Sequence, residues 1–245
     1  MDGGGEVGAL MRAHDWSRSP LGAPTTWPQT LRAVVGLMLN SKFPMFVAWG
    51  PELGFLYNDA YAEILGEKHP RSLGARFHDI WSEIWTDIWP LIEAAMAGQA
   101  TFRENLPLTM NRKGYDEETW FTFSYSPVRD EHGTVAGMFC AVAETTAQVL
   151  AEARLARSEA QFRNLADAMP QLVWTANADG HVDYYNARRS RYRGIGEREG
   201  VWTWAPMVHP DDIDRTAAAW NAAPASCCEC CRVRGGSTST RGEER

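Results

Sequence analysis

Cysteine is the residue of this sequence whose clustering most directly suggests chemistry. Four of the five cysteines lie within residues 227–231, in the order Cys-Cys-Glu-Cys-Cys. Four thiolates can hold a zinc ion, but adjacent cysteines point in diverging directions, and the cysteine pairs with two-residue spacers that form zinc sites are missing. We therefore predict no metal site.

The remaining reactive side chains do not form a catalytic constellation. Cys140 lies within an apolar run, where a small buried side chain is expected. The segment 209–212, His-Pro-Asp-Asp, has the composition of a helix start, because proline and acidic residues suit a first helical turn. The sequence has no glycine-rich phosphate loop, nucleophile elbow or zinc-protease motif. We therefore predict no catalytic residue and no catalytic domain in this chain.

Large aromatic side chains mark the candidate binding site. In the segment 77–97, tryptophans and isoleucines each recur every four residues, as on one face of a helix. Aromatic and polar residues alternate along 120–128, as on a half-buried strand. These faces either form a solid core or line a small cavity, and the volume of their side chains favours a mostly filled core. The candidate cavity-lining residues are Trp85, Trp89, Ile92, Phe121, Phe123, Tyr125 and Phe139.

A β-hairpin over 118–146 would position the strand side of this site. The alternating run 120–128 is followed by a polar turn that ends in Gly133, and then by the small and apolar run 135–143. Small residues suit a central strand that is closely packed on both faces. Glu144, Thr145 and Thr146 come next and lead directly into a charged helical run. We predict that these three residues carry a signal from the sheet to that helix.

The segments before this hairpin complete one α+β domain. The predicted order is an amphipathic helix over 27–39, two short strands over 45–49 and 53–57, short helices, a longer helix and three strands. Short connections make the last three strands antiparallel neighbours. We expect Asn58 to cap the helix that follows the second strand. The fold class is therefore α+β, with one five-stranded antiparallel sheet and flanking short helices.

A helix over 148–169 follows this domain, and after it the same order of strands and helices begins again. Leu155, Phe162 and Met169 lie seven residues apart in that helix, which predicts a weak coiled coil and a parallel homodimer through 148–169. Tyr185-Asn186 repeats Tyr57-Asn58 after 128 residues, in the same context of a strand that ends before a helix. Such an offset indicates a domain duplication.

These motifs resemble a known family. Residues 43–147 resemble a PAS domain through FLYNDAY, PLIEAAMAG, the hairpin ETWFTFSYSPVRDEHGTVAGMF and the Glu-Thr-Thr that follows it. Residues 159–220 resemble the first half of a second PAS domain, through FRNLADAMPQLVWTANADGHVDYYN and MVHPDD. With HDWSRSPLG and TTWPQTL in front, the chain is similar to the N-terminal sensory regions of bacterial sensor histidine kinases.

The resemblance implies a domain organisation. We expect an N-terminal segment with an amphipathic helix (1–42), a PAS domain (43–147), a signalling helix (148–169), half of a second PAS domain (170–220) and a tail (221–245). The tail contains one aliphatic β-forming residue, Val233, so it cannot complete a second sheet. We expect it to be disordered and to follow a loss of the reading frame near 222–224, which would leave a truncated sensor without a kinase core.

The resemblance also implies a function. We expect a sensory module that binds a small ligand or a partner and passes the signal through a dimeric helix. The alternative is a PAS domain loaded with haem or flavin, as in redox and gas sensors. The photoadduct cysteine motif is missing, and His69 and His78 lie outside the long helix that carries a haem ligand in such sensors, so we predict no cofactor. Kinase activity and a response-regulator partner would belong only to a full-length parent.

Composition excludes several other partners. The net charge is −7 and no basic cluster stands out, so nucleic acid is not expected. The longest apolar runs are far shorter than a membrane span, and the N-terminus lacks the basic start and apolar segment of a signal peptide. We therefore predict a cytoplasmic protein that does not bind membranes.

Overall fold

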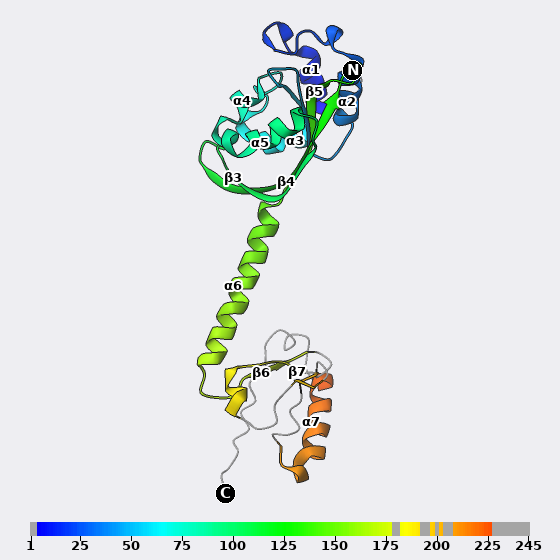
Figure 1. Cartoon of the computed structure of the whole chain (residues 1–245). Helices are drawn as coiled ribbons and strands as arrows, with labels where there is room; N and C mark the ends of the chain where they lie inside the picture. Colours follow the sequence, from blue (N-terminus) through cyan, green and yellow to red (C-terminus); the bar gives the residue numbers. More distant parts are fainter. Residues whose placement is uncertain (1–3, 178–181, 192–196, 199–200, 203–207, 227–245) are drawn as a thin grey trace. The chain divides into compact units, whose positions relative to one another are not determined.

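The computed structural model describes residues 4–177, 182–191, 197–198, 201–202 and 208–226. The chain divides into two compact units, Met1–Glu152 and Ala153–Arg245, and each has a β-sheet of its own (Figure 1). None of the helices in the described ranges combines the length and the hydropathy that a membrane span requires.

The first unit is built on a five-stranded antiparallel sheet, which confirms the predicted fold class. The strands lie in the order β2-β1-β5-β4-β3, so β5 is central. Their bounds are Met45–Trp49 (β1), Gly54–Tyr57 (β2), Thr101–Met110 (β3), Glu117–Arg129 (β4) and Val135–Glu144 (β5).

The small residues of β5 are explained by its place between β1 and β4. Gly137 of β5 lies opposite Trp49 of β1 and Val128 of β4. A Cβ atom at Gly137 would lie 2.5 Å from the carbonyl oxygen of Ala48, which is closer than van der Waals contact permits. Glycine at this position therefore allows β1 to approach β5 closely.

Helices cover both faces of the sheet at β1 and β2. Phe46 and Tyr57 are paired on one face, Val47 and Leu56 are paired on the other, and all four side chains are buried. In Figure 1, α3, α4 and α5 lie on one side of the sheet and α2 lies on the other. The helices of this unit are α1 (Gly5–Ala13), α2 (Gln29–Leu39), α3 (Asp59–Leu65), α4 (Phe77–Ile80) and α5 (Trp85–Met96).

Helix α1 was not predicted, because its stabilising partner is distant in sequence. Its N-terminal end carries the Val7 amide, which donates a hydrogen bond of 2.7 Å to Oδ1 of Asp59. Val7 and Met11 are buried in the core of the unit. A partner 52 residues away leaves no local pattern in a glycine-rich segment.

Helix α5 continues through Pro90, although proline commonly kinks or ends a helix. Proline removes the amide donor to the carbonyl four residues earlier, and that carbonyl belongs to Thr86, in the first turn of α5. The buried side chains of Ile88, Leu91 and Ile92 hold the helix to the core on both sides of the proline.

The second unit has a small sheet, in which a strand ends at Tyr185 as the sequence predicted and two further strands were not predicted. Helix α6 (Thr146–Ala168) precedes β6 (Trp174–Ala176) and β7 (Val182–Tyr185), which pair antiparallel. The strands β8 (Glu197–Arg198) and β9 (Val201–Trp202) extend this sheet to four strands in the order β6-β7-β9-β8. Strands of two residues are too short to give an alternating pattern.

The C-terminal end of the described chain differs from the expected domain boundary. Helix α7 spans Ile213–Ser226 and so continues beyond residue 220, where the tail was expected to begin. The cysteine cluster and the rest of the tail, 227–245, lie outside the described residues.

Candidate functional site

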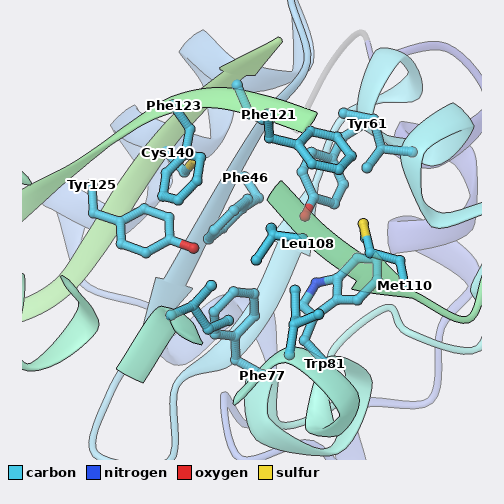
Figure 2. Close-up of a pocket in the computed structure, with 14 residues that line it drawn as sticks. Phe46, Tyr61, Phe77, Trp81, Leu108, Met110, Phe121, Phe123, Tyr125 and Cys140 are labelled. Carbon is cyan, nitrogen blue, oxygen red and sulfur yellow. The ribbon is translucent and has the colours of Figure 1, made fainter. Parts of the chain in front are cut away.

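A small and mostly apolar cavity lies between the sheet of the first unit and helices α3 to α5 (Figure 2). Its volume is about 30 Å³, which is room for one or two water molecules. The lining residues are Phe46, Tyr61, Ile64, Phe77, Trp81, Ile84, Ile88, Leu108, Met110, Phe121, Phe123, Tyr125, Cys140 and Val142. The core is therefore nearly filled by its own side chains.

The polar groups at the cavity are neutral hydrogen-bonding groups. Figure 2 shows the hydroxyl oxygens of Tyr61 and Tyr125 directed toward the middle of the cavity-lining side chains. Burial raises the pKa of both hydroxyls well above its usual value, and it raises the pKa of the Cys140 thiol in the same way. Ionisation of these groups is therefore suppressed, and Cys140 is not an activated thiolate.

Three of the predicted cavity residues line the cavity. Phe121, Phe123 and Tyr125 alternate along β4 and present their rings to it, as the period of two requires. Ile92 is fully buried but does not reach the cavity wall. Phe139 lies on the opposite face of β5, because its neighbour Cys140 points into the cavity.

The two tryptophans of the predicted set lie elsewhere. Trp85 and Trp89 lie in contact, with ring centroids 5.4 Å apart and the rings tilted by 30°, and line an open surface groove, where Trp89 is 42% exposed. The reason is a break in the helix: α4 ends at Ile80, and a 3-10 turn, Ser82–Ile84, precedes α5. The spacing of four residues therefore does not keep Trp81 and Trp85 on one face, and only Trp81 lines the cavity.

The sequence analysis missed the first-strand side of the cavity. Phe46 of β1 and Phe77 of α4 lie in contact, with ring centroids 5.0 Å apart, and both line the cavity. The signal was present in the apolar run 45–49, but β1 is buried on both faces. Such a strand shows no alternation, so its sequence does not tell which residues face the helices.

Neither flavin nor haem fits this cavity. A pocket for a ring system of that size needs several hundred Å³, whereas this cavity has about 30 Å³ and is enclosed by aromatic and aliphatic side chains. Its lining includes no histidine. Among the described residues, no group of three or more His, Cys, Asp or Glu side chains is placed to hold a metal ion.

A buried arginine joins the cavity region to the start of α6. Arg112 is 4% exposed, and its guanidinium donates two hydrogen bonds to the carboxylate of Glu144, at 2.8 and 2.9 Å. It also donates to Oε1 of Glu117 at 2.5 Å and to the carbonyl oxygen of Ile64 at 3.3 Å. The guanidinium lies 5.8 Å from the ring of Phe121, which lines the cavity. No role was predicted for Arg112 from the sequence.

The ion pairs of Arg112 govern the ionisation of its partners. Burial by itself would raise the pKa of Glu144, but the hydrogen bonds and the charge of Arg112 outweigh burial and lower that pKa. The pKa of Glu117 is lowered in the same way, by Arg112 and Lys113. Both carboxylates are therefore ionised at neutral pH and balance the buried cation.

The predicted exit residues converge on the first turn of α6. The hydroxyl of Thr146 donates to Oε1 of Glu144 at 3.0 Å and accepts a hydrogen bond of 3.0 Å from the amide of Trp120. The amide of Thr145 donates to the carbonyl of Trp120 at 2.8 Å. Arg112, Glu144, Thr146 and the backbone of β4 therefore form one hydrogen-bonded cluster, which we call the exit cluster.

Phe123→Ala tests whether the aromatic core is filled. Removal of a buried ring from a filled core should lower the free energy of unfolding by about 3–5 kcal/mol. Chemical denaturation measures this, and Phe102→Ala on the neighbouring strand is the control, because Phe102 is 60% exposed and its loss should cost about 0.5 kcal/mol or less. A change in melting midpoint of only about two degrees for Phe123→Ala would contradict a filled core.

Glu144→Gln tests the ion pair through pH. Because the pKa of Glu144 is lowered on folding from its usual 4.5, its contribution is fully present above that value and is lost as pH falls through the folded value. The variant should be less stable at pH 7 by about 1–2 kcal/mol, since Glu144 stays partly exposed to solvent, and should lose less stability on acidification.

Urea denaturation between pH 7 and pH 3 measures the free energy of unfolding at pH 7 and its decrease on acidification. Glu118→Gln is the control, because Glu118 is an exposed carboxylate on β4, and this variant should follow the wild type. Equal acid sensitivity of Glu144→Gln and the wild type would contradict the assigned role.

Comparison with known proteins agrees with this architecture. Residues 43–150 match the sequence model of the family described as the PAS fold. A stretch of 93 residues is 36% identical to the peroxide stress-activated histidine kinase mak1 of Schizosaccharomyces pombe, which is 35% of this chain and 6% of that protein. The chain thus spans a small part of this curated relative.

Several solved structures are also similar. An RNA-binding light-oxygen-voltage receptor matches with a TM-score of 0.41 and 17% identity, over 58% of this chain and 40% of that one. The PAS domain of BvgS from Bordetella pertussis matches with a TM-score of 0.35 and 16% identity, over 53% of this chain and 99% of that one. A sensory box sensor histidine kinase from Vibrio cholerae matches with a TM-score of 0.34 and 11% identity, over 47% and 92%.

The family match and the five-stranded sheet cover the same residues and lead to one conclusion. Residues 43–150 of this chain have the PAS fold, and the chain is similar in sequence to a histidine kinase over a stretch of 93 residues.

Proposed function

We propose that this chain is the sensory part of a histidine-kinase signalling protein, in which the PAS domain responds to a change at its cavity and passes that change to a dimer formed through 148–169. The observation that carries the proposal is the exit cluster. Arg112 contacts the wall of the cavity through Phe121, and Glu144 and Thr146 connect it to the first turn of α6. A shift of β4 at Phe121 would therefore change the hydrogen bonds at the start of α6.

The proposed signal is a small ligand or a contact with a partner that changes the packing of the cavity. At about 30 Å³ the cavity holds little more than water, so a larger ligand would have to bind a rearranged form of the core. A ligand shifts such an equilibrium only by the difference between its affinities for the two forms. The candidate sensing side chains are Phe121, Phe123 and Tyr125, with Tyr61 and Trp81 on the helix side.

The exposed apolar side chains of α6 support the proposed homodimer. Leu155 and Leu165 are 71% and 67% exposed, and Phe162 and Met169, which directly follows α6, are also exposed. These residues occupy the a and d positions of a heptad pattern. An apolar stripe exposed along a charged helix is typical of an interface with a second copy of the same helix.

Catalysis and downstream partners would depend on other segments. In this proposal the kinase reaction and the recognition of a response regulator belong to a longer parent protein, since this chain spans 6% of the histidine kinase that it matches. The chain itself would contribute sensing and helix-mediated transmission.

Substitutions in the α6 stripe test the dimer. Leu155→Asp combined with Leu165→Asp should convert dimers into monomers, because a coiled-coil seam would bury these charges without partners. Phe162 is left intact because its ring lies 5.6 Å from that of Tyr184, and its replacement would remove this contact within the second unit. Analytical ultracentrifugation gives the dissociation constant of the dimer.

The matched control carries the same charges on the opposite side of the helix. Ala153 and Ala160 are exposed and lie outside the seam, so Ala153→Asp with Ala160→Asp should leave the dimer intact. A monomeric wild-type chain, or equal weakening by both pairs of substitutions, would contradict the proposed dimer.

A synthetic ligand tests the transmission from the cavity to the dimer. Phe123→Ala enlarges an apolar cavity, and such cavities take up benzene. If the exit cluster couples the cavity to α6, benzene should change the dissociation constant of the Phe123→Ala dimer by about fivefold or more. Benzene should leave the dimer of Phe102→Ala unchanged, because no cavity is made there.

Arg112→Lys tests whether benzene can bind in the cavity without changing the dissociation constant of the dimer. Lysine keeps the charge but loses the two-pronged hydrogen bonding to Glu144. In the background of Phe123→Ala, this substitution should leave the benzene-induced rise in melting temperature in place and abolish the change in the dimer. Benzene binding without any effect on the dimer of Phe123→Ala itself would contradict the proposal.

A further inference from the structure

Two buried asparagines occupy matching places in the two units. Asn58 follows β2 and Asn186 follows β7, and the side chains of both are fully buried. They lie 128 residues apart in the sequence. The sequence suggested a helix-capping role for Asn58 only, and the hydrogen bonds of both residues reach further.

Asn58 ties three separate segments together. Its side-chain amide donates to the carbonyl of Met38, in the last turn of α2, at 3.1 Å, and to the carbonyls of Ser41 and Phe43 at 3.2 and 2.8 Å. Its side-chain oxygen accepts from the amide of Met45, in β1, at 3.1 Å and from the amide of Tyr61, in α3, at 3.0 Å. One side chain therefore holds the end of α2, the start of β1 and the start of α3.

Asn186 repeats this arrangement with equivalent partners. Its side-chain amide donates to the carbonyl of Ala166, in the last turn of α6, at 2.6 Å, and to the carbonyl of Gln171 at 3.0 Å. Its side-chain oxygen accepts from the amide of Val173 at 3.1 Å. These three partners lie 128 residues after Met38, Phe43 and Met45, so the offset holds for each bond and not only for the asparagines.

We infer that Asn58 and Asn186 are equivalent positioning residues, each of which fixes the last turn of the helix that enters its own sheet. The entering helix is α2 in the first unit and α6 in the second. Helix α6 is thus held at both ends, by Thr146 at its start and by Asn186 at its last turn. The inference rests on the proposed function only in treating α6 as a transmitting helix, and it adds α2 as the corresponding input helix of the PAS domain.

Asparagine is suited to this task because its amide both donates and accepts. Aspartate has nearly the same shape but, when ionised, can only accept hydrogen bonds. Asn58→Asp therefore keeps the bonds from Met45 and Tyr61, and turns the bonds to Met38, Ser41 and Phe43 into repulsion between oxygens. The substitution separates the anchoring of the helix from the capping of α3.

Hydrogen exchange on the full chain measures the effect. In Asn58→Asp, the protection factors of amides in the last two turns of α2 should fall about tenfold or more, because a buried set of hydrogen bonds is lost. The amides of β4 and β5 should keep their protection. Tryptic cleavage after Lys42, which follows α2, should accelerate to a similar extent.

The pH dependence distinguishes positioning from a general structural role. A protonated aspartic acid regains one donor, and burial beside carbonyl oxygens favours that form. Protection of α2 in Asn58→Asp should therefore recover as pH is lowered, whereas protection factors in the wild type, which are corrected for intrinsic exchange, should show no such recovery.

Two further variants complete the test. Asn40 is exposed, and its side-chain amide donates a hydrogen bond of 2.8 Å to the carbonyl of Gly36, so Asn40→Asp should leave α2 protected. Asn186→Asp should deprotect the last turns of α6 and leave α2 unchanged. Uniform loss of protection across the first sheet in Asn58→Asp, unchanged α2 protection, or no effect of Asn186→Asp on α6 would overturn the inference. None of these outcomes depends on benzene or on the dimer, which test the proposed function separately.

Discussion

The buried charge of Arg112 is the constraint on which the exit from the PAS domain depends. A guanidinium removed from water is costly unless it is paired and fully hydrogen-bonded. Here it is satisfied by Glu144 at the end of β5, by Glu117 at the start of β4 and by the carbonyl of Ile64 in α3. These segments must therefore meet at one point, and that point lies where α6 begins.

The same constraint explains why the exit is built from polar residues beside an apolar core. Glu144 shares its carboxylate between Arg112 and the hydroxyl of Thr146, and that hydroxyl in turn binds the backbone of Trp120. Removing Glu144 would leave the buried guanidinium of Arg112 without its two-pronged partner, so these two side chains depend on each other. A cluster of this kind has few alternative arrangements, which suits the transmission of a small displacement.

The cavity and the exit cluster are stabilised by different interactions: ring packing at the cavity, and hydrogen bonds and ion pairs in the exit cluster. The cavity is a contact surface of rings, such as Phe46 against Phe77 and Phe123 against Tyr125, with about 30 Å³ left open. Close-packed interiors transmit even small changes in volume, because neighbouring side chains cannot deform independently. Phe121 belongs to both regions, since its ring lines the cavity and faces the guanidinium of Arg112.

Much of the fold was determined by patterns that operate over a few residues. The alternation along β4, the small residues of β5, the cap at Asn58 and the repeat at Asn186 could all be read from neighbouring side chains, and so could three of the cavity residues, Phe121, Phe123 and Tyr125. Local patterns succeed here because pleating and helix capping depend on nearest neighbours.

The tertiary structure decided what depended on distant partners. Trp85 and Trp89 lie outside the cavity because a 3-10 turn separates them from Trp81, and Phe139 lies outside it because of the face that β5 turns toward the helices. Arg112 was not predicted to have a role, because its partner Glu144 is 32 residues away in the sequence. Sequence spacing predicts which residues share a face, but only packing decides which face is buried and which charges meet.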